Sequence, residues 1–163
     1  MLNENLISEM IDFDAGDPKR IQHFLKVYEF AHLIGVSENL DPKTMKILEA
    51  AAILHDIGIH PAEEKYGSCG GKLQEREGPE YAEIILEKYP EFSDEERERI
   101  CYLIGHHHTY SEVDGLDYRI LLEADFLVNA FEDNLNSESI RTFRDKVFVT
   151  KTGTELLNKI FGI

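Results

Sequence analysis

The 163-residue chain is long enough to bury one hydrophobic core and short for two, so a single domain is expected over residues 1–163. Its 42% hydrophobic and 30% charged residues exclude a disordered or fibrous protein. The 32 acidic and 17 basic residues give a formal net charge of -15, which repels long polyanions and argues against extended DNA or RNA as a partner.

Helical signals dominate the first third of the chain. Apolar residues at helical spacing predict a first helix over about residues 2–13. An Asp-Pro pair at residues 17–18 is typical of an N-cap followed by the first helical position, and it predicts a second helix that ends near Gly35. The same pair at residues 41–42 predicts a third helix that runs to about His55.

The segment from residue 61 to residue 78 loses this periodicity and is rich in glycine. Its glycines are Gly67, Gly70, Gly71 and Gly78. Because glycine lowers the cost of backbone rearrangement, we interpret the segment as a mobile loop that closes over a substrate, and a disordered connector is the alternative.

The rest of the chain again favours helices. A helical pattern covers residues 79–89, and Ser93 with Glu96 forms a capping-box signature for a helix that leads into three consecutive histidines. Val147 to Thr150 is β-branched and aromatic, which leaves a short strand there as an alternative. The overall prediction is an all-α helical bundle. Its last helices are expected at about residues 118–131, 137–149 and 154–161.

Histidine and acidic residues gather at a few points of this pattern. Six of the seven histidines, all but His32, lie in or near segments that also carry apolar faces. His55 and Asp56 end the apolar run 50–54, where an ionised carboxylate is costly to bury without a metal or another partner. Imidazole and carboxylate ligands suit iron, manganese, zinc, nickel or cobalt, so the pattern indicates a metal site.

Three segments resemble the H…HD…D signature of the HD-domain superfamily of metal-dependent phosphohydrolases. Residues 20–23 read Arg-Ile-Gln-His, residues 54–58 read Leu-His-Asp-Ile-Gly, and residues 122–125 read Leu-Glu-Ala-Asp. The resemblance covers about residues 18–132 and implies a small single-domain member, with the C-terminal helices of residues 137–163 packing on it. It further implies one divalent metal ion, of undetermined identity among Mn, Fe, Co, Ni, Zn and Mg, held by His23, His55, Asp56 and Asp125.

Larger members of the superfamily bind two metals, and this chain matches their pattern in part. For the later additional histidine we favour His107, then His106, within the run 106–108. At the earlier additional position the chain has Glu77, whose carboxylate could also ligate a hard metal. A second metal at Glu77, His106 and His107 is therefore left open. Several relatives carry a lysine just after HD-x-G, where this chain has Ile59 and then His60.

The resemblance implies hydrolysis of a phosphoester or phosphoanhydride by metal-activated water. Asp56 would orient the water, and His106, His107 or His60 would stabilise charge or protonate the leaving group. Lys72 and Arg76 are candidate contacts to the substrate phosphate. Simpler interpretations remain for these residues: the triple histidine could cap a helix end, and the others could be solvated charges or a loop histidine.

A small phosphorylated substrate, with a nucleotide or dinucleotide as the first candidate, is the leading hypothesis. The alternatives are an HD-fold di-iron oxygenase and a non-catalytic module that binds a nucleotide or a partner protein. The longest apolar run is far below the roughly 20 residues that a bilayer crossing needs, and the first ten residues carry no Lys or Arg. We therefore expect a cytoplasmic protein with no membrane partner, while a homodimer is left open.

Overall fold

The computed structural model describes residues 1–163 and consists of nine helices without a strand, which confirms the all-α prediction. None of these helices has the length and apolar character required to span a bilayer. The helices are α1 Leu2–Phe13, α2 Pro18–Ser37, α3 Pro42–Leu54, α4 Ile59–Tyr66, α5 Gly71–Leu86, α6 Asp94–Ile104, α7 Leu116–Glu132, α8 Ser137–Val147 and α9 Lys151–Phe161.

Three helices begin where the sequence predicts, and each start has a local cause. The Asp17 side chain accepts a hydrogen bond from a backbone N–H in the first turn of α2, and Asp41 does the same for α3. Ser93 and Glu96 form both hydrogen bonds of the capping box at the start of α6. Side-chain caps of this kind satisfy backbone donors that have no partner inside the helix.

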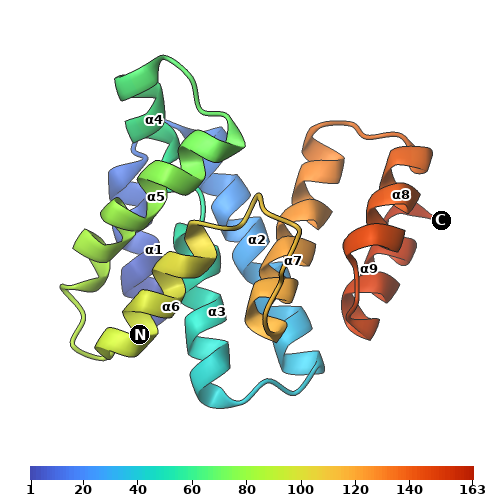
Figure 1. The fold of residues 1–163 in the computed structure, drawn as a ribbon, viewed down its shortest axis with the longest axis horizontal. Helices are drawn as coiled ribbons and strands as arrows, with labels where there is room; N and C mark the ends of the chain where they lie inside the picture. The colour runs from blue at the N-terminus through green and yellow to red at the C-terminus, as the bar shows by residue number, and fades with distance from the viewer.

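Helices α2, α3 and α7 form the middle of the bundle, with α1, α4 and α5 on one side and α8 and α9 on the other (Figure 1). A continuous core of 33 buried residues reaches from Leu6 in α1 to Leu157 in α9. Because α2 packs against both α3 and α7, side chains from these three helices meet inside the bundle. His23 lies in α2, His55 follows the last residue of α3, and Asp125 lies in α7.

The predicted mobile loop at residues 61–78 is wrong, because α4 and α5 occupy most of this segment. Two of its glycines, Gly71 and Gly78, lie where neighbouring atoms leave no room for a side chain. A Cβ on Gly58 would lie 2.5 Å from the backbone nitrogen of Gly78, so the two backbones touch where the helices cross. Gly67 ends α4 with a left-handed φ of 67°, a conformation that favours glycine. Helix α5 begins at Gly71. The predicted start near Pro79 is too late, because Pro79 lies inside the helix.

The alternative strand at Val147 to Thr150 does not form. Val147 ends α8, Phe148 is extended, and the Thr150 side chain accepts a hydrogen bond from the backbone N–H of Gly153 to cap α9. This short extended stretch has no strand to pair with, so its β-favouring residues connect two helices. Phe148 packs against the core.

Candidate metal centre

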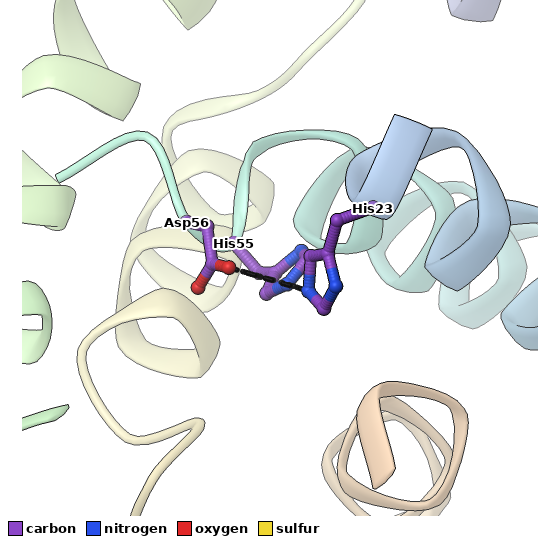
Figure 2. A group of neighbouring side chains, drawn as sticks. All are labelled: His23, His55 and Asp56. Carbon is purple, nitrogen blue, oxygen red and sulfur yellow. Dashed lines mark hydrogen bonds and ion pairs between the residues drawn. The ribbon is translucent and has the colours of Figure 1, made fainter. Parts of the chain in front are cut away.

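Four side-chain atoms from three parts of the chain converge at one point. His23 Nε2 lies 3.1 Å from His55 Nε2. Asp125 Oδ1 lies 3.2 Å from the first of these nitrogens and 3.4 Å from the second, and Asp56 Oδ2 lies 3.3 and 3.4 Å from them. Figure 2 shows His23, His55 and Asp56 pointing toward one another. Three of these residues, His23, His55 and Asp56, offer ligand atoms that all lie within 4.8 Å of one another, a spacing at which they could hold a metal ion.

The outer nitrogens of both imidazoles are already used. His23 Nδ1 lies 3.0 Å from Glu132 Oε1, and His55 Nδ1 lies 2.8 Å from the carbonyl oxygen of Ala52. An ionised carboxylate and a carbonyl only accept hydrogen bonds, so each Nδ1 carries a hydrogen and donates it. In the neutral rings both Nε2 atoms therefore present lone pairs to the same point, as metal-ligating histidines do.

These donors fit a divalent cation. Two imidazole lone pairs 3.1 Å apart repel each other unless a proton or a metal lies between them. Asp125 Oδ1 is buried and accepts no hydrogen bond, which is costly for a carboxylate oxygen unless a cation compensates it. A metal at this point would satisfy both requirements at once.

The electrostatics of the metal-free chain lead to the same conclusion. Burial by itself lowers the pKa of an imidazole, yet the carboxylates of Asp125 and Asp56 outweigh burial and raise the pKa of His23 to about 11 and that of His55 to about 9. In return, the imidazoles hold the pKa of both carboxyls below its ordinary value despite their burial. Both carboxyl groups of the centre therefore stay ionised. Their negative charge is balanced either by a proton on an imidazole or by a metal ion that competes with that proton.

Asp56 also faces a second group of donors. His107 Nε2 lies 3.0 Å from Asp56 Oδ1, and its Nδ1 donates to the carbonyl oxygen of Ile104. Asp56, His107 and His108 offer ligand atoms that all lie within 4.8 Å of one another. Burial, with the neighbouring His107, lowers the pKa of His108 to about 4, so this ring is neutral at pH 7, as a ligand must be. The two carboxylate oxygens of Asp56 thus serve two adjacent groups.

The run of three histidines divides into different environments. His107 is fully buried and His108 packs over Gly71, where an added Cβ would lie 2.9 Å from the ring. His106 turns away: its Nδ1 donates to the Tyr102 carbonyl oxygen and its ring stacks on the Tyr102 ring at 4.0 Å. Of the two histidines that the sequence favours, His107 faces Asp56 and His106 does not, and the second inward ring is His108.

Glu77 joins neither group. Lys65 Nζ donates to Glu77 Oε2 at 2.5 Å and Tyr66 Oη donates to Oε1 at 2.8 Å, so both oxygens have partners. Lys65 and Tyr66 belong to α4, the helix that the sequence analysis took for a loop. The hypothesis that Glu77 ligates a second metal is therefore corrected: this carboxylate ties α5 to α4.

His60 lies in a separate polar cluster where α1, α2 and α4 meet. Its Nε2 lies 3.0 Å from Asp17 Oδ2 and 3.6 Å from Asp14 Oδ1. Asp14 is almost fully buried, one of its oxygens has no partner, and burial raises its pKa to about 6. His60 Nε2 points to these carboxylates and not to the four converging donors, contrary to the predicted catalytic role.

Lys72 and Arg76 are also turned elsewhere. Lys72, with 78% of its side chain exposed, pairs with Glu75 at 2.9 Å. The Arg76 guanidinium lies over the Tyr66 ring, 5.7 Å from its centroid. The predicted phosphate contacts therefore do not reach the converging donors, because both residues lie on the outer side of α5.

A cavity of about 300 Å³ opens beside the four donors, and its cations come from the start of α2. Lys19 and Arg20 line it together with His23, Asp56 and His108. Sequence reasoning missed both cations, although they lie three and four residues before His23 and so on the same side of the helix.

Sequence reasoning also missed Glu132, which lines the same cavity and accepts from His23. It follows Asp125 by seven residues, which is two helical turns, so both carboxylates share one face of α7. That spacing in the sequence indicates that Glu132 lies on the same side of the helix as Asp125. His108 had no such signal, because the turn after α6 decides its direction.

Comparisons with known proteins agree with this geometry. Residues 20–135 match the HD domain family. No curated protein sequence matches the chain. Among solved structures, a predicted HD superfamily hydrolase from an uncultured Thermotogales bacterium is 28% identical with a TM-score of 0.66, and the alignment covers 97% of this chain and 82% of that one. Since the family match includes every residue of the four-donor cluster and most of the chain, the protein belongs to the HD-domain family.

Proposed function

We propose that this protein is a metal-dependent phosphohydrolase that cleaves a phosphoester or phosphoanhydride of a small molecule, with a nucleotide or dinucleotide as the substrate class. The observation that carries the proposal is the unpartnered Asp125 Oδ1 among three further donor atoms. Membership of a family with a hydrolase-like solved relative adds support at the level of hydrolysis.

The divalent cation would be held by His23, His55, Asp56 and Asp125. When bound, such a cation polarises a phosphoryl oxygen and lowers the pKa of a water molecule toward neutrality. Glu132 keeps the Nδ1 hydrogen on His23, so that Nε2 is free to act as a ligand.

The remaining chemistry belongs to the chain's own side chains. Asp56 Oδ1 and His107 Nε2, 3.0 Å apart, form a pair that can orient a water molecule and hold its proton. His108 lines the cavity as a neutral imidazole whose Nε2–H is donated to Gln74 Oε1 at 2.8 Å, so its Nδ1 has a lone pair that can accept a hydrogen bond or act as a ligand.

The positive charges at the cavity suit a phosphate. Lys19 is exposed at its rim, and Arg20 is held there by Asp17 at 3.1 Å and by Glu63 at 2.5 Å. In a chain with a net charge of -15, Lys19 and Arg20 place two adjacent cations beside the donor cluster, in a cavity whose lining also includes Asp56, Glu132 and Asp133. A cavity of about 300 Å³ favours a small phosphorylated molecule over a polymer.

The test is a screen for phosphate release from nucleotides, dinucleotides and sugar phosphates, repeated with Mn, Co, Fe, Ni, Zn and Mg. We expect release from at least one nucleotide, and its loss in Asp125→Ala but not in the matched control Glu77→Gln. Absence of release with every metal would contradict the proposal. Oxygen consumption by the iron-loaded protein in the same screen would instead favour the oxygenase alternative.

A further inference from the structure

A second cavity, of about 560 Å³, lies between α8 and the segment that follows the three histidines. Tyr110 and Phe143 provide its aromatic walls, and Glu138, Ser139, Thr142 and Lys146 provide polar groups. It is separate from the smaller cavity beside the four donors and lies within the volume range of small-molecule sites. Nothing in the chemistry described so far uses it.

Each aromatic wall of this cavity packs against another aromatic ring. The Tyr110 ring meets the Phe143 ring edge-on, with centroids 5.2 Å apart and an interplanar angle of 87°. Phe143 stacks in parallel on Phe126 at 3.7 Å, so its ring is supported from behind. Tyr110 remains 47% exposed. A supported ring beside an exposed one is a suitable surface for a flat aromatic ligand.

Tyr110, and Phe126 that supports the Phe143 wall from behind, are close in sequence to residues of the two donor groups. Phe126 directly follows Asp125, and Tyr110 is two residues after His108. Because consecutive Cα atoms are about 3.8 Å apart, the backbone of Tyr110 lies within about 8 Å of that of His108. This is the length scale that separates the phosphate of a nucleotide from its base, so one ligand can reach both places.

The polar groups come from one face of α8. Ser139, Thr142, Phe143 and Lys146 are spaced by three or four residues, as side chains on the same side of a helix are. Hydroxyl and ammonium groups beside aromatic rings match a ligand that is flat and carries hydrogen-bonding atoms at its edge. A purely aliphatic ligand would leave these polar groups without partners.

We propose that this pocket binds the base of a nucleotide substrate, stacked on Tyr110 and Phe143 beside the polar face of α8. The inference rests on the proposed function for the position of the phosphate, and it adds the part of the substrate that determines specificity. Base stacking on aromatic side chains tolerates different bases, so the polar groups of α8 would select among them.

The test measures binding to the metal-free protein, so it does not depend on turnover. Adenosine, which has no phosphate, is the probe, and ribose is the non-aromatic control. In saturation-transfer NMR and calorimetric titration we expect adenosine to bind through its base protons and ribose to give no signal. Tyr110→Ala should raise the Kd for adenosine at least about tenfold, and Tyr110→Phe should restore most of the affinity.

Tyr102→Ala is the matched control, because Tyr102 is another half-exposed tyrosine but does not line this cavity. It should bind adenosine like the unchanged protein. Circular dichroism confirms that each variant is folded. No binding of adenosine to the unchanged protein, or equal affinity in Tyr110→Ala, overturns the inference.

The two proposals fail in different ways. Adenosine binding that depends on Tyr110, with no phosphate release from any nucleotide, supports the base pocket and contradicts the hydrolase. Phosphate release without adenosine binding supports the hydrolase and contradicts the base pocket.

Discussion

Two buried carboxylates, Asp125 and Glu77, are equally hidden from solvent, with 4% and 5% exposure, and yet differ in what surrounds them. Glu77 accepts one hydrogen bond from an ammonium group and one from a phenol. Asp125 faces two imidazoles whose outer nitrogens are already engaged, and its Oδ1 accepts no hydrogen bond. Burial of an acid is therefore not by itself a sign of a metal site. The sign is a buried acid whose neighbours are further ligands instead of donors.

The largest effect in this comparison is expected from Asp125→Ala. Loss of one ligand among four should remove the metal and lower phosphate release at least about 100-fold, since even changes to residues that only support ligands cost 10- to 100-fold. Metal content by atomic emission and phosphate release measure the two losses separately. A variant that retains one metal per chain would show that Asp125 is not a ligand.

Metal removal should have the next largest effect. A metal that binds only the folded chain, present at about 100 times its Kd, contributes about 3 kcal/mol to the free energy of unfolding. Thermal unfolding with and without a chelator should therefore give a lower Tm for the chelated protein. In Asp125→Ala the chelator should change nothing. An equal shift in both proteins would mean that the metal is held elsewhere.

The polar cluster of His60, Asp17 and Asp14 is a third region to compare. Its test is the pH dependence of the free energy of unfolding. Burial raises the pKa of Asp14 to about 6, although His60 opposes the shift. The folded chain then binds this proton more tightly than the unfolded chain, so the free energy of unfolding falls as pH rises from about 4 to about 6 and stays lower above that. Asp14→Asn removes this fall.

Urea unfolding at pH 4.5 and pH 7 measures the effect of Asp14. The variant should gain about 1 to 2 kcal/mol relative to the unchanged protein between the two pH values, after allowance for solvent screening. An identical pH dependence in both proteins would mean that Asp14 keeps an ordinary pKa in the folded chain.

The smallest effect is expected from Glu77→Gln. The variant loses the ion pair with the half-exposed Lys65, which should lower the Tm by less than about 4 °C. Metal content should stay at the value of the unchanged protein, because neither donor group includes Glu77. A loss of metal in Glu77→Gln would return this residue to the metal centre and remove the contrast with Asp125.

The proposed metal ligands and the proposed phosphate contacts differ in how closely the sequence predicts their positions. The spacing of one signature predicts His23, His55, Asp56 and Asp125 as a group, and in the structure the two histidine Nε2 atoms lie within 3.4 Å of each other and of one oxygen from each aspartate. The glycine-rich segment predicts Lys72 and Arg76 as phosphate contacts. That segment is helical, so its cations point outward and Lys19 and Arg20 line the cavity instead.

By itself, the sequence determined the features that depend on interactions within about one helical turn. Asp17, Asp41 and Ser93 cap the helices that follow them, since a cap needs only a side-chain oxygen and the backbone N–H groups two or three residues ahead. Ligand types also belong to this category, because a histidine or an aspartate carries its lone pairs wherever the fold places it.

Only the tertiary structure decided which of these groups meet. Glycine in a sequence is compatible with either mobility or close packing, and the contact of Gly58 with Gly78 selects packing because another backbone lies within 3 Å of where a Cβ would be. The inward turn of His107 and His108, and the pairing of Glu77 with Lys65, likewise depend on how neighbouring helices cross. These are long-range distances, and no local pattern of residues encodes them.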